Sequence, residues 1–187
     1  MKLGHETTES IENYLNDTGK QISFRHQDVL DVFMNVSYER TGIWKTHSKK
    51  RRDRMISEAM SYTRRDLLLL KYKQNGYSAK GIKEGHVYAV TNPAWDGFVK
   101  IGCAIDVFDR LNSYQTSSPH RDYKLEKYIF SYDRIKTEQL MHTMFSRGRL
   151  GEWCECDITI VKDIFKNVIN NSFSDDKETN IIQCYPY

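Results

Sequence analysis

Long hydrophobic runs are missing from this chain of 187 residues, 28% of which are charged. No apolar stretch approaches the roughly 18 residues that a membrane-spanning helix needs. The first residues, Met-Lys-Leu-Gly-His-Glu, also lack the apolar core of a secretory signal peptide. We therefore expect a protein without a membrane partner, located in the cytoplasm.

Cysteine is also scarce, with Cys103, Cys154, Cys156 and Cys184 as the four members. A small secreted disulfide framework is usually denser and more evenly spaced. Cys154-Glu-Cys156 is a C-x-C pair, and its spacing relative to His142 and Cys103 fits no zinc pattern that we can justify. We expect reduced thiols, with a small zinc-bound interaction module as an alternative.

The net charge is only +3, yet it is unevenly distributed. Residues 45–73 contain ten basic and three acidic residues, a net charge of +7. Residues 152–187 contain three basic and seven acidic residues, a net charge of −4. A concentrated basic segment suggests a polyanionic partner, although a solvated helix face would have the same composition.

The first part of the chain has helical periodicity. Residues 1–20 are polar and predict a loose or weakly helical start, whereas residues 25–36 and 48–61 place apolar side chains at helical intervals. Thr63-Arg-Arg-Asp66 resembles a capping box and predicts that a further helix begins at Arg64 and ends near Lys73. Residues 1–74 therefore read as a helical, basic region, compatible with a helix-turn-helix.

The cations of this helical region are the candidate DNA contacts, because Lys and Arg side chains neutralise backbone phosphates. They are Lys49, Lys50, Arg51, Arg52, Arg54, Arg64 and Arg65. Residues 75–85 contain three glycines without apolar periodicity and predict a linker.

The second part of the chain alternates between strand and helix patterns, which predicts an α+β fold. Residues 86–91 and 98–103 read as a hairpin around a turn at 92–97. The further expected elements are a helix at 106–114, a strand at 123–132, a helix at 134–146, a short strand at 153–156 and a helix at 158–168. Residues 171–187 read as a polar tail.

Five short motifs occur in order on these elements. They are Gly-His-Val-Tyr-Ala-Val at 85–90, Phe-Val-Lys-Ile-Gly at 98–102, Asp-Arg-Leu at 109–111, Glu-Gln-Leu-Met-His at 138–142 and Gly-Glu-Trp at 151–153. Together they resemble the GIY-YIG endonuclease superfamily, in the phage-type branch whose second motif reads Lys-Ile-Gly. The resemblance implies a nuclease domain at 86–170 with a small three-stranded antiparallel sheet flanked by helices, and a phage or mobile-element source.

The resemblance also implies roles for individual residues. Tyr88, Lys100, Arg110 and His142 correspond to catalytic positions, and Glu138 corresponds to the metal-binding glutamate. Fixed cations stabilise the charge of a phosphodiester transition state, and Lys100 would lower the pKa of Tyr88 so that its phenol could take a proton from water. A single carboxylate suits Mg²⁺ or Mn²⁺, both of which keep several water ligands.

The chain departs from the family pattern at three positions. His86 replaces the first motif's glycine, Lys100 replaces the second tyrosine, and Cys154 replaces the phenylalanine that usually follows Glu-Trp. A late asparagine found in some members has no counterpart, but no catalytic position is deleted.

Each residue also has a plain structural interpretation. Tyr88 and Trp153 fit core positions, Lys100 and Arg110 fit a charged surface, and Glu138 fits a simple helix pair with the histidine four residues later. We expect a metal-dependent endonuclease that acts on double-stranded DNA. If a phage encodes the protein, its expected location is the cytoplasm of the host cell. The alternatives are a non-catalytic DNA-binding regulator and an RNA-cleaving enzyme. The sequence does not indicate the target site or the oligomeric state.

Overall fold

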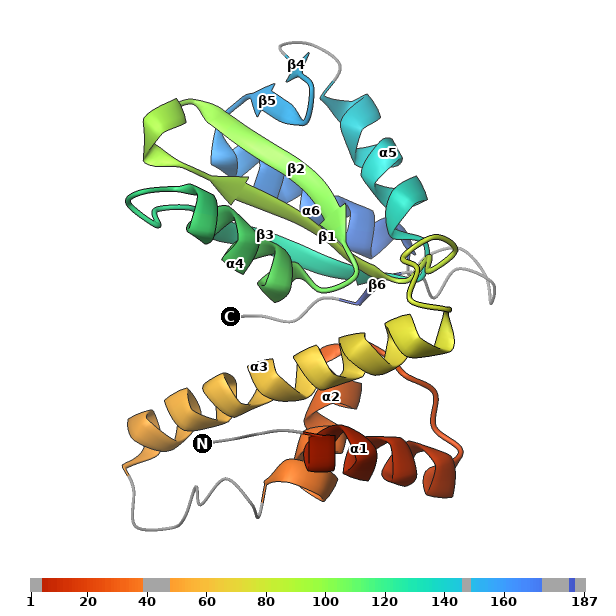
Figure 1. Cartoon of the computed structure of the whole chain (residues 1–187). Coiled ribbons are helices and arrows are strands. Elements are labelled where there is room, and N and C mark those ends of the chain that lie inside the picture. Colours follow the sequence, from red (N-terminus) through yellow and green to blue (C-terminus); the bar gives the residue numbers. More distant parts are fainter. Residues whose placement is uncertain (1–4, 39–47, 146–148, 173–181, 184–187) are drawn as a thin grey trace. The chain divides into compact units, whose positions relative to one another are not determined.

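The structure is a computed structural model (Figure 1) and describes residues 5–38, 48–145, 149–172 and 182–183. The chain forms two compact units, residues 1–82 and residues 83–187. The first unit is helical, and the second combines helices with an antiparallel sheet, so the predicted α+β class is confirmed. No helix in the described part of the chain is long and apolar enough to cross a membrane.

The N-terminal unit is built on three helical segments. They are α1 (His5–Thr18), α2 (His26–Val32), which continues into the π-helical turn η1 (Phe33–Ser37), and α3 (Lys49–Gln74). Their shared core consists of buried apolar side chains, among them Ile11, Leu15, Phe24, Val29, Phe33, Met60, Leu67 and Leu70. Of the two expectations for residues 1–20, loose or weakly helical, the helical one is confirmed: α1 packs against α3 and buries Ile11 and Leu15.

The two helices predicted at 48–61 and 64–73 are one continuous helix, α3. The capping box that separated them is not formed, since Thr63 is buried inside the helix and Asp66 accepts a hydrogen bond from Thr8 instead. Lys49–Gln74 contains no glycine or proline that would break the helix. The helix ends at Asn75, where Gly76 follows with a positive φ.

The C-terminal unit contains a six-stranded sheet in the order β4-β5-β2-β1-β3-β6. Its centre is the predicted set of three strands, β1 (Gly85–Thr91), β2 (Phe98–Ala104) and β3 (Lys124–Ser131), all antiparallel. The short strand expected at 153–156 is β5 (Trp153–Glu155), which pairs with β2. The sheet is wider than the three strands predicted because β4 (Arg149–Leu150) also pairs with β5, and β6 (Ile182–Gln183) pairs with β3.

Helices cover both faces of this sheet (Figure 1). One face packs against α4 (Val107–Ser117), which begins at Asp106, whose carboxylate accepts hydrogen bonds from the first backbone amides. The other face packs against α5 (Arg134–Met144) and α6 (Ile158–Ser172), whose Met141, Val161 and Phe165 are fully buried. Successive side chains of β1 therefore pack into the two cores in alternation, which explains why six consecutive residues of this strand are buried.

Glycine at position 85 is required by close packing. Gly85 has φ 152°, and a Cβ there would overlap the carbonyl oxygen of Ala104 and approach Arg134 Cδ to 2.9 Å. The neighbouring His86 is buried and its Nδ1 lies 3.1 Å from the carbonyl oxygen of Ile105. A side chain at position 85, at this end of the sheet, would therefore collide with its neighbours.

Candidate active site

The face of the sheet covered by α4 carries most of the predicted catalytic residues. Tyr88 of β1 pairs with Gly102 of β2, and Lys100 of β2 pairs with Trp153 of β5. Directly paired residues share a face of an antiparallel sheet, and so do residues two apart along a strand. These four residues therefore point to the same side, where α4 contributes Arg110.

A pair of phenols occupies the centre of this face. The hydroxyl oxygens of Tyr88 and Tyr114 lie 2.8 Å apart and share a hydrogen bond. Tyr88 is only 1% exposed, whereas Tyr114 of α4 is half-buried. Gly102 makes room for the buried phenol, because a Cβ there would lie 2.7 Å from the Tyr88 hydroxyl oxygen. Only a residue without a side chain fits opposite this tyrosine.

Two cations converge on the ring of Tyr114. The guanidinium carbon of Arg110 lies 5.5 Å from the ring centroid, and the Nζ of Lys100 lies 5.4 Å from it. Lys100 also forms an ion pair with Glu152, whose side chain is half exposed. Arg110 is on the surface, so its guanidinium is open to an anion.

The pKa of Tyr88 is shifted upwards. Burial is the main cause, the hydrogen bond to Tyr114 adds to it, and the Arg110 guanidinium opposes it. The cation that lowers the pKa of Tyr88 is therefore Arg110 and not Lys100, contrary to the expectation from the sequence. Lys100 instead holds the pKa of the Glu152 carboxyl below its usual range.

Glu138 and His142 approach β2 from the opposite face, on α5. The thiol of Cys103 donates a hydrogen bond to Glu138 Oε2 at 3.0 Å, and His142 Nε2 lies 3.7 Å from Glu138 Oε1. His142 is buried, while the side chain of Glu138 is 19% exposed. Burial and the neighbouring Glu138 raise the pKa of the Cys103 thiol to about 12. The thiol therefore stays protonated at neutral pH and orients the carboxylate.

Glu152 connects the two halves of this arrangement. The pKa of its carboxyl is lowered mainly by the hydrogen bond to Lys100, and further by the charges of Arg110 and His142. It thus lies within electrostatic range of groups on both α4 and α5. The backbone carbonyl of Glu152 also accepts a hydrogen bond from Ile101 N at 3.0 Å, which fixes the 151–153 turn beside β2.

The donor chemistry of Glu138 fits a hard cation. Mg²⁺ and Mn²⁺ prefer carboxylate oxygens and retain water ligands, so one partly exposed carboxylate suffices on the protein side. No group of three His, Cys, Asp or Glu side chains is positioned to share a metal ion among the described residues. Cys103, Cys154 and Cys156 are unpaired among the described residues.

The predicted DNA contacts in the N-terminal unit have different surroundings. Lys49, Lys50 and Arg51 are exposed, and Arg52 is half-buried, all in the first turn of α3. Arg64 is 7% exposed, and its Nη2 lies 3.4 Å from His26 Nδ1. The prediction that Arg64 contacts DNA is therefore wrong, since its guanidinium is enclosed in the helical core. The side chain of Arg54 lies outside the described part.

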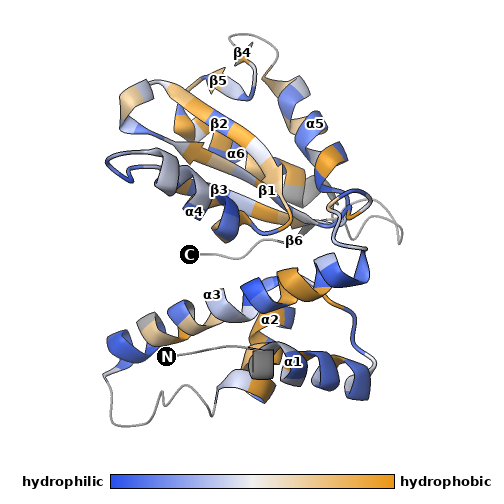
Figure 2. Ribbon diagram, viewed as in Figure 1, coloured by the Kyte–Doolittle hydropathy of each residue, from blue (hydrophilic) through white to orange (hydrophobic). Residues whose placement is uncertain are grey.

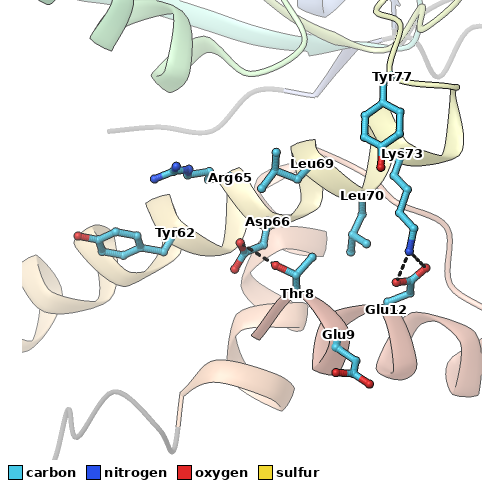
Figure 3. A pocket seen from close by; sticks show the side chains of 10 residues that line it. All are labelled: Thr8, Glu9, Glu12, Tyr62, Arg65, Asp66, Leu69, Leu70, Lys73 and Tyr77. Carbon is cyan, nitrogen blue, oxygen red and sulfur yellow. Dashed lines mark hydrogen bonds and ion pairs between the residues drawn. The ribbon is translucent and has the colours of Figure 1, made fainter. Parts of the chain in front are cut away.

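Arg65 is exposed but has a mixed environment. It lines a cavity of about 750 Å³ between α1 and α3, together with the acidic Glu9, Glu12 and Asp66 (Figure 3). Lys73 crosses the same cavity to form an ion pair with Glu12 at 3.0 Å. This part of α3 therefore lacks the uniform positive charge of its first turn.

Sequence reasoning missed Tyr114 and Cys103 as members of the site. Tyr114 follows Arg110 by four residues, which places both side chains on one face of α4. That spacing was visible in the sequence. The contact between Cys103 and Glu138 was not, because it depends on how α5 packs across β2.

Residues 85–169, somewhat less than half of the chain, match the sequence profile of the T5orf172 domain family. This domain is associated with phage proteins and with endonuclease-like proteins, so the C-terminal unit is similar to a phage-associated, DNA-acting domain. No curated protein and no solved structure shows significant similarity to the chain.

Proposed function

We propose that the chain is a metal-dependent DNA endonuclease of the GIY-YIG type, held on double-stranded DNA by its N-terminal unit. The observation that carries the proposal is the convergence of Arg110 and Lys100 on the Tyr88–Tyr114 phenol pair. Glu138 reaches β2 from the opposite face, and Glu152 lies within electrostatic range of groups on both faces. These groups come from separate elements of the sequence. Their combination matches the needs of phosphodiester hydrolysis, which are an anion clamp, hydrogen bonds that orient the water and a metal-binding carboxylate.

The cations hold the scissile phosphate. Arg110 offers a planar pair of N–H donors that can bind two phosphate oxygens, and its position over Tyr114 restricts its rotamers. Lys100 has three N–H donors, of which Glu152 occupies one. The remaining donors stabilise negative charge on the non-bridging oxygens as the transition state forms.

The phenol pair orients the attacking water through hydrogen bonds. Tyr114 is the half-exposed member that water can reach, and Tyr88 is its buried hydrogen-bond partner. The raised pKa of Tyr88 keeps it a neutral phenol, which offers hydrogen bonds but does not take the proton of the water. His142, next to Glu138, is the candidate acceptor of that proton.

Glu138 is the residue that would hold the metal ion. A bound Mg²⁺ or Mn²⁺ would supply Lewis-acid stabilisation of the phosphate and the leaving oxygen. Cys103 keeps the carboxylate oriented through its hydrogen bond to Oε2, which leaves the Oε1 side towards His142.

The test incubates the full chain with supercoiled plasmid in Mg²⁺, in Mn²⁺ and in chelator. We expect nicked or linear product with either metal, and none with chelator. Glu138→Gln should lower the rate by on the order of 100-fold or more, whereas Asp163→Asn, at an exposed carboxylate on α6, should not. Undiminished cleavage in chelator would contradict the metal assignment. DNA binding without cleavage would favour a non-catalytic regulator, and cleavage of RNA alone would favour an RNase.

The first turn of α3 supports DNA targeting by the N-terminal unit. Four cations, Lys49, Lys50, Arg51 and Arg52, stand where the helix dipole is already positive, and the first turn contains no acidic residue. Cations at this end disfavour the helix, but the same end attracts anions, so a bound phosphate would relieve the repulsion.

A charge-neutralised variant tests this targeting. Converting Lys50, Arg51 and Arg52 to Gln should weaken DNA binding and reduce the slope of log K against log salt by up to about 3. The Mg²⁺-dependent rate at saturating DNA should stay the same. Lys80→Gln with Lys83→Gln, which removes two charges at exposed residues outside α3, provides the control. An unchanged salt slope would remove α3 from the DNA-binding surface.

A further inference from the structure

Four aromatic side chains form a continuous row beside the candidate active site. Ring centroids are 4.7 Å apart between Trp153 and Trp95, 6.2 Å between Trp95 and Tyr123, and 5.2 Å between Tyr123 and Tyr114. Lys100 contacts the rings at both ends of this row: its Nζ lies 5.4 Å from the Tyr114 centroid and 5.7 Å from the Trp153 centroid. We call Tyr114, Tyr123, Trp95 and Trp153 the aromatic row.

The aromatic row is more exposed than aromatic side chains that only pack in a core. Trp95 is 47% exposed and lies on η3 (Pro93–Trp95), the turn between β1 and β2. Its rings meet those of Tyr123 and Trp153 at 61° and 70°, so neither of these neighbours stacks flat on the indole. The other three rings are half-buried. Tryptophan is usually well buried in a protein core, so this placement leaves apolar ring surface available to a flat ligand.

The charges around the row select the kind of ligand. Lys100 and Arg110 present positive charge at the Tyr114 end, where the candidate site would hold a phosphate. Flat aromatic rings beside cations are the arrangement with which proteins bind single nucleic-acid strands, since bases stack on the rings while phosphates meet the cations. A fully paired duplex keeps its base faces covered by stacking. Only an unpaired base can offer its face to Trp95.

We propose that the aromatic row stacks an unpaired DNA base adjacent to the phosphate held by Lys100 and Arg110, so that the preferred substrate contains an unpaired or distorted nucleotide. This inference rests on the proposed function and names the substrate class of the same site. A base stacked on an aromatic side chain strengthens binding by roughly 5- to 150-fold.

The experiment measures binding of the full chain by fluorescence anisotropy, in chelator so that no cleavage occurs. Three labelled duplexes are compared: one with a single unpaired thymine, one with an abasic residue at that position, and one fully paired. The wild-type chain should bind the thymine duplex at least about 5-fold more tightly than the abasic duplex. Tryptophan emission should be quenched by the thymine duplex more than by the abasic one.

Variants of Trp95 assign the effect to the row. Trp95→Ala should bind the thymine and abasic duplexes equally, and Trp95→Phe, which keeps a ring, should retain most of the difference. Tyr77→Ala serves as the control, because Tyr77 is 79% exposed and belongs to the N-terminal unit. It should leave the difference unchanged.

The outcomes separate the two proposals. Equal binding of the thymine and abasic duplexes by the wild-type chain overturns the stacking surface while DNA binding itself stands. A thymine preference that survives Trp95→Ala also overturns it. Absence of binding to all three duplexes overturns the proposed function, and the stacking surface with it.

Discussion

The two units hold their candidate functional residues in opposite ways. In the C-terminal unit, Tyr88 and Gly102 are buried in the centre of the sheet, and Lys100 and Arg110 pack against aromatic rings. In the N-terminal unit, the cations project from the first turn of α3 with few fixed partners among the described residues. Figure 2 shows the same contrast, with largely apolar strands β1 and β2 and long hydrophilic stretches in α1 and α3. The candidate catalytic residues are thus held in a fixed geometry by a packed core, whereas the candidate phosphate contacts need only be charged and exposed.

The largest expected effect tests whether the two cores are independent. Phe165 on α6 and Phe33 on η1 are both completely buried, one in each unit. Truncation of either to alanine should lower the stability of its own unit by about 3–5 kcal/mol, because it leaves a cavity. Urea titrations followed by two-dimensional NMR would report the two units separately.

Exposed apolar residues provide the controls for these truncations. Ile160→Ala and Met34→Ala, at side chains 52% and 46% exposed, should change stability by less than about 0.5 kcal/mol. If Phe33→Ala destabilised both units equally, they would unfold as one body and the comparison between two independent units would fail.

The next effect concerns the phenol pair. Gly102→Ala would place a Cβ 2.7 Å from the Tyr88 hydroxyl oxygen and 2.9 Å from its Cζ, inside a packed core. We expect destabilisation of the C-terminal unit by about 1–3 kcal/mol and loss of plasmid cleavage. Denaturation midpoints and nicking rates measure the two effects.

A double variant distinguishes steric overlap from a general loss of packing. Tyr88→Phe removes the closest atom, so Gly102→Ala should be less destabilising in that background than in the wild-type chain. Gly97→Ala is the comparison at an open position, where only backbone strain from φ 77° acts. Equal effects of Gly102→Ala in both backgrounds would show that the overlap with the hydroxyl is unimportant.

The sequence predicted the parts of the molecule that depend on local pattern. Strong alternation and turn residues located β1, β2 and β3, and Asp106 marked the start of α4. The edge strands β4 and β6 were missed because two residues each carry no periodic signal. The division of α3 failed because Thr63-Arg-Arg-Asp66 resembled a cap, although burial of Thr63 in the helical core outweighs that local preference.

The candidate site was predictable to the extent that motifs identify residues, but their interactions were not. The motifs correctly located the predicted residues on neighbouring elements: Tyr88 on β1, Lys100 on β2, Arg110 on α4 and Glu138 on α5. The sequence assigned Lys100 the task of lowering the Tyr88 pKa, whereas in the structure burial raises this pKa and Arg110 is the cation that opposes the rise. Arg64 was predicted as a surface cation because its neighbours are charged, yet helix packing encloses it beside His26. Such outcomes depend on tertiary contacts far apart in the sequence.

The smallest expected effect concerns the pair of His26 and Arg64 in the N-terminal unit. Burial, and next the positive charge of Arg64, lower the pKa of His26 below its ordinary value near 6.5. The unfolded chain therefore binds a proton at a higher pH than the folded chain does. The stabilising contribution is complete above about pH 6.5 and declines as the pH falls towards the folded pKa, below which it stays constant.

The N-terminal unit should accordingly be less stable at pH 5 than at pH 7.5, by less than either phenylalanine truncation. Asp66, whose pKa is raised mainly by burial, acts with the opposite sign. The difference between wild type and His26→Asn isolates the histidine, since every other group is common to both. Urea titrations at the two pH values, read from amides of residues 5–38, should show a smaller pH dependence in His26→Asn. An identical dependence in both proteins would assign the effect to a group other than His26.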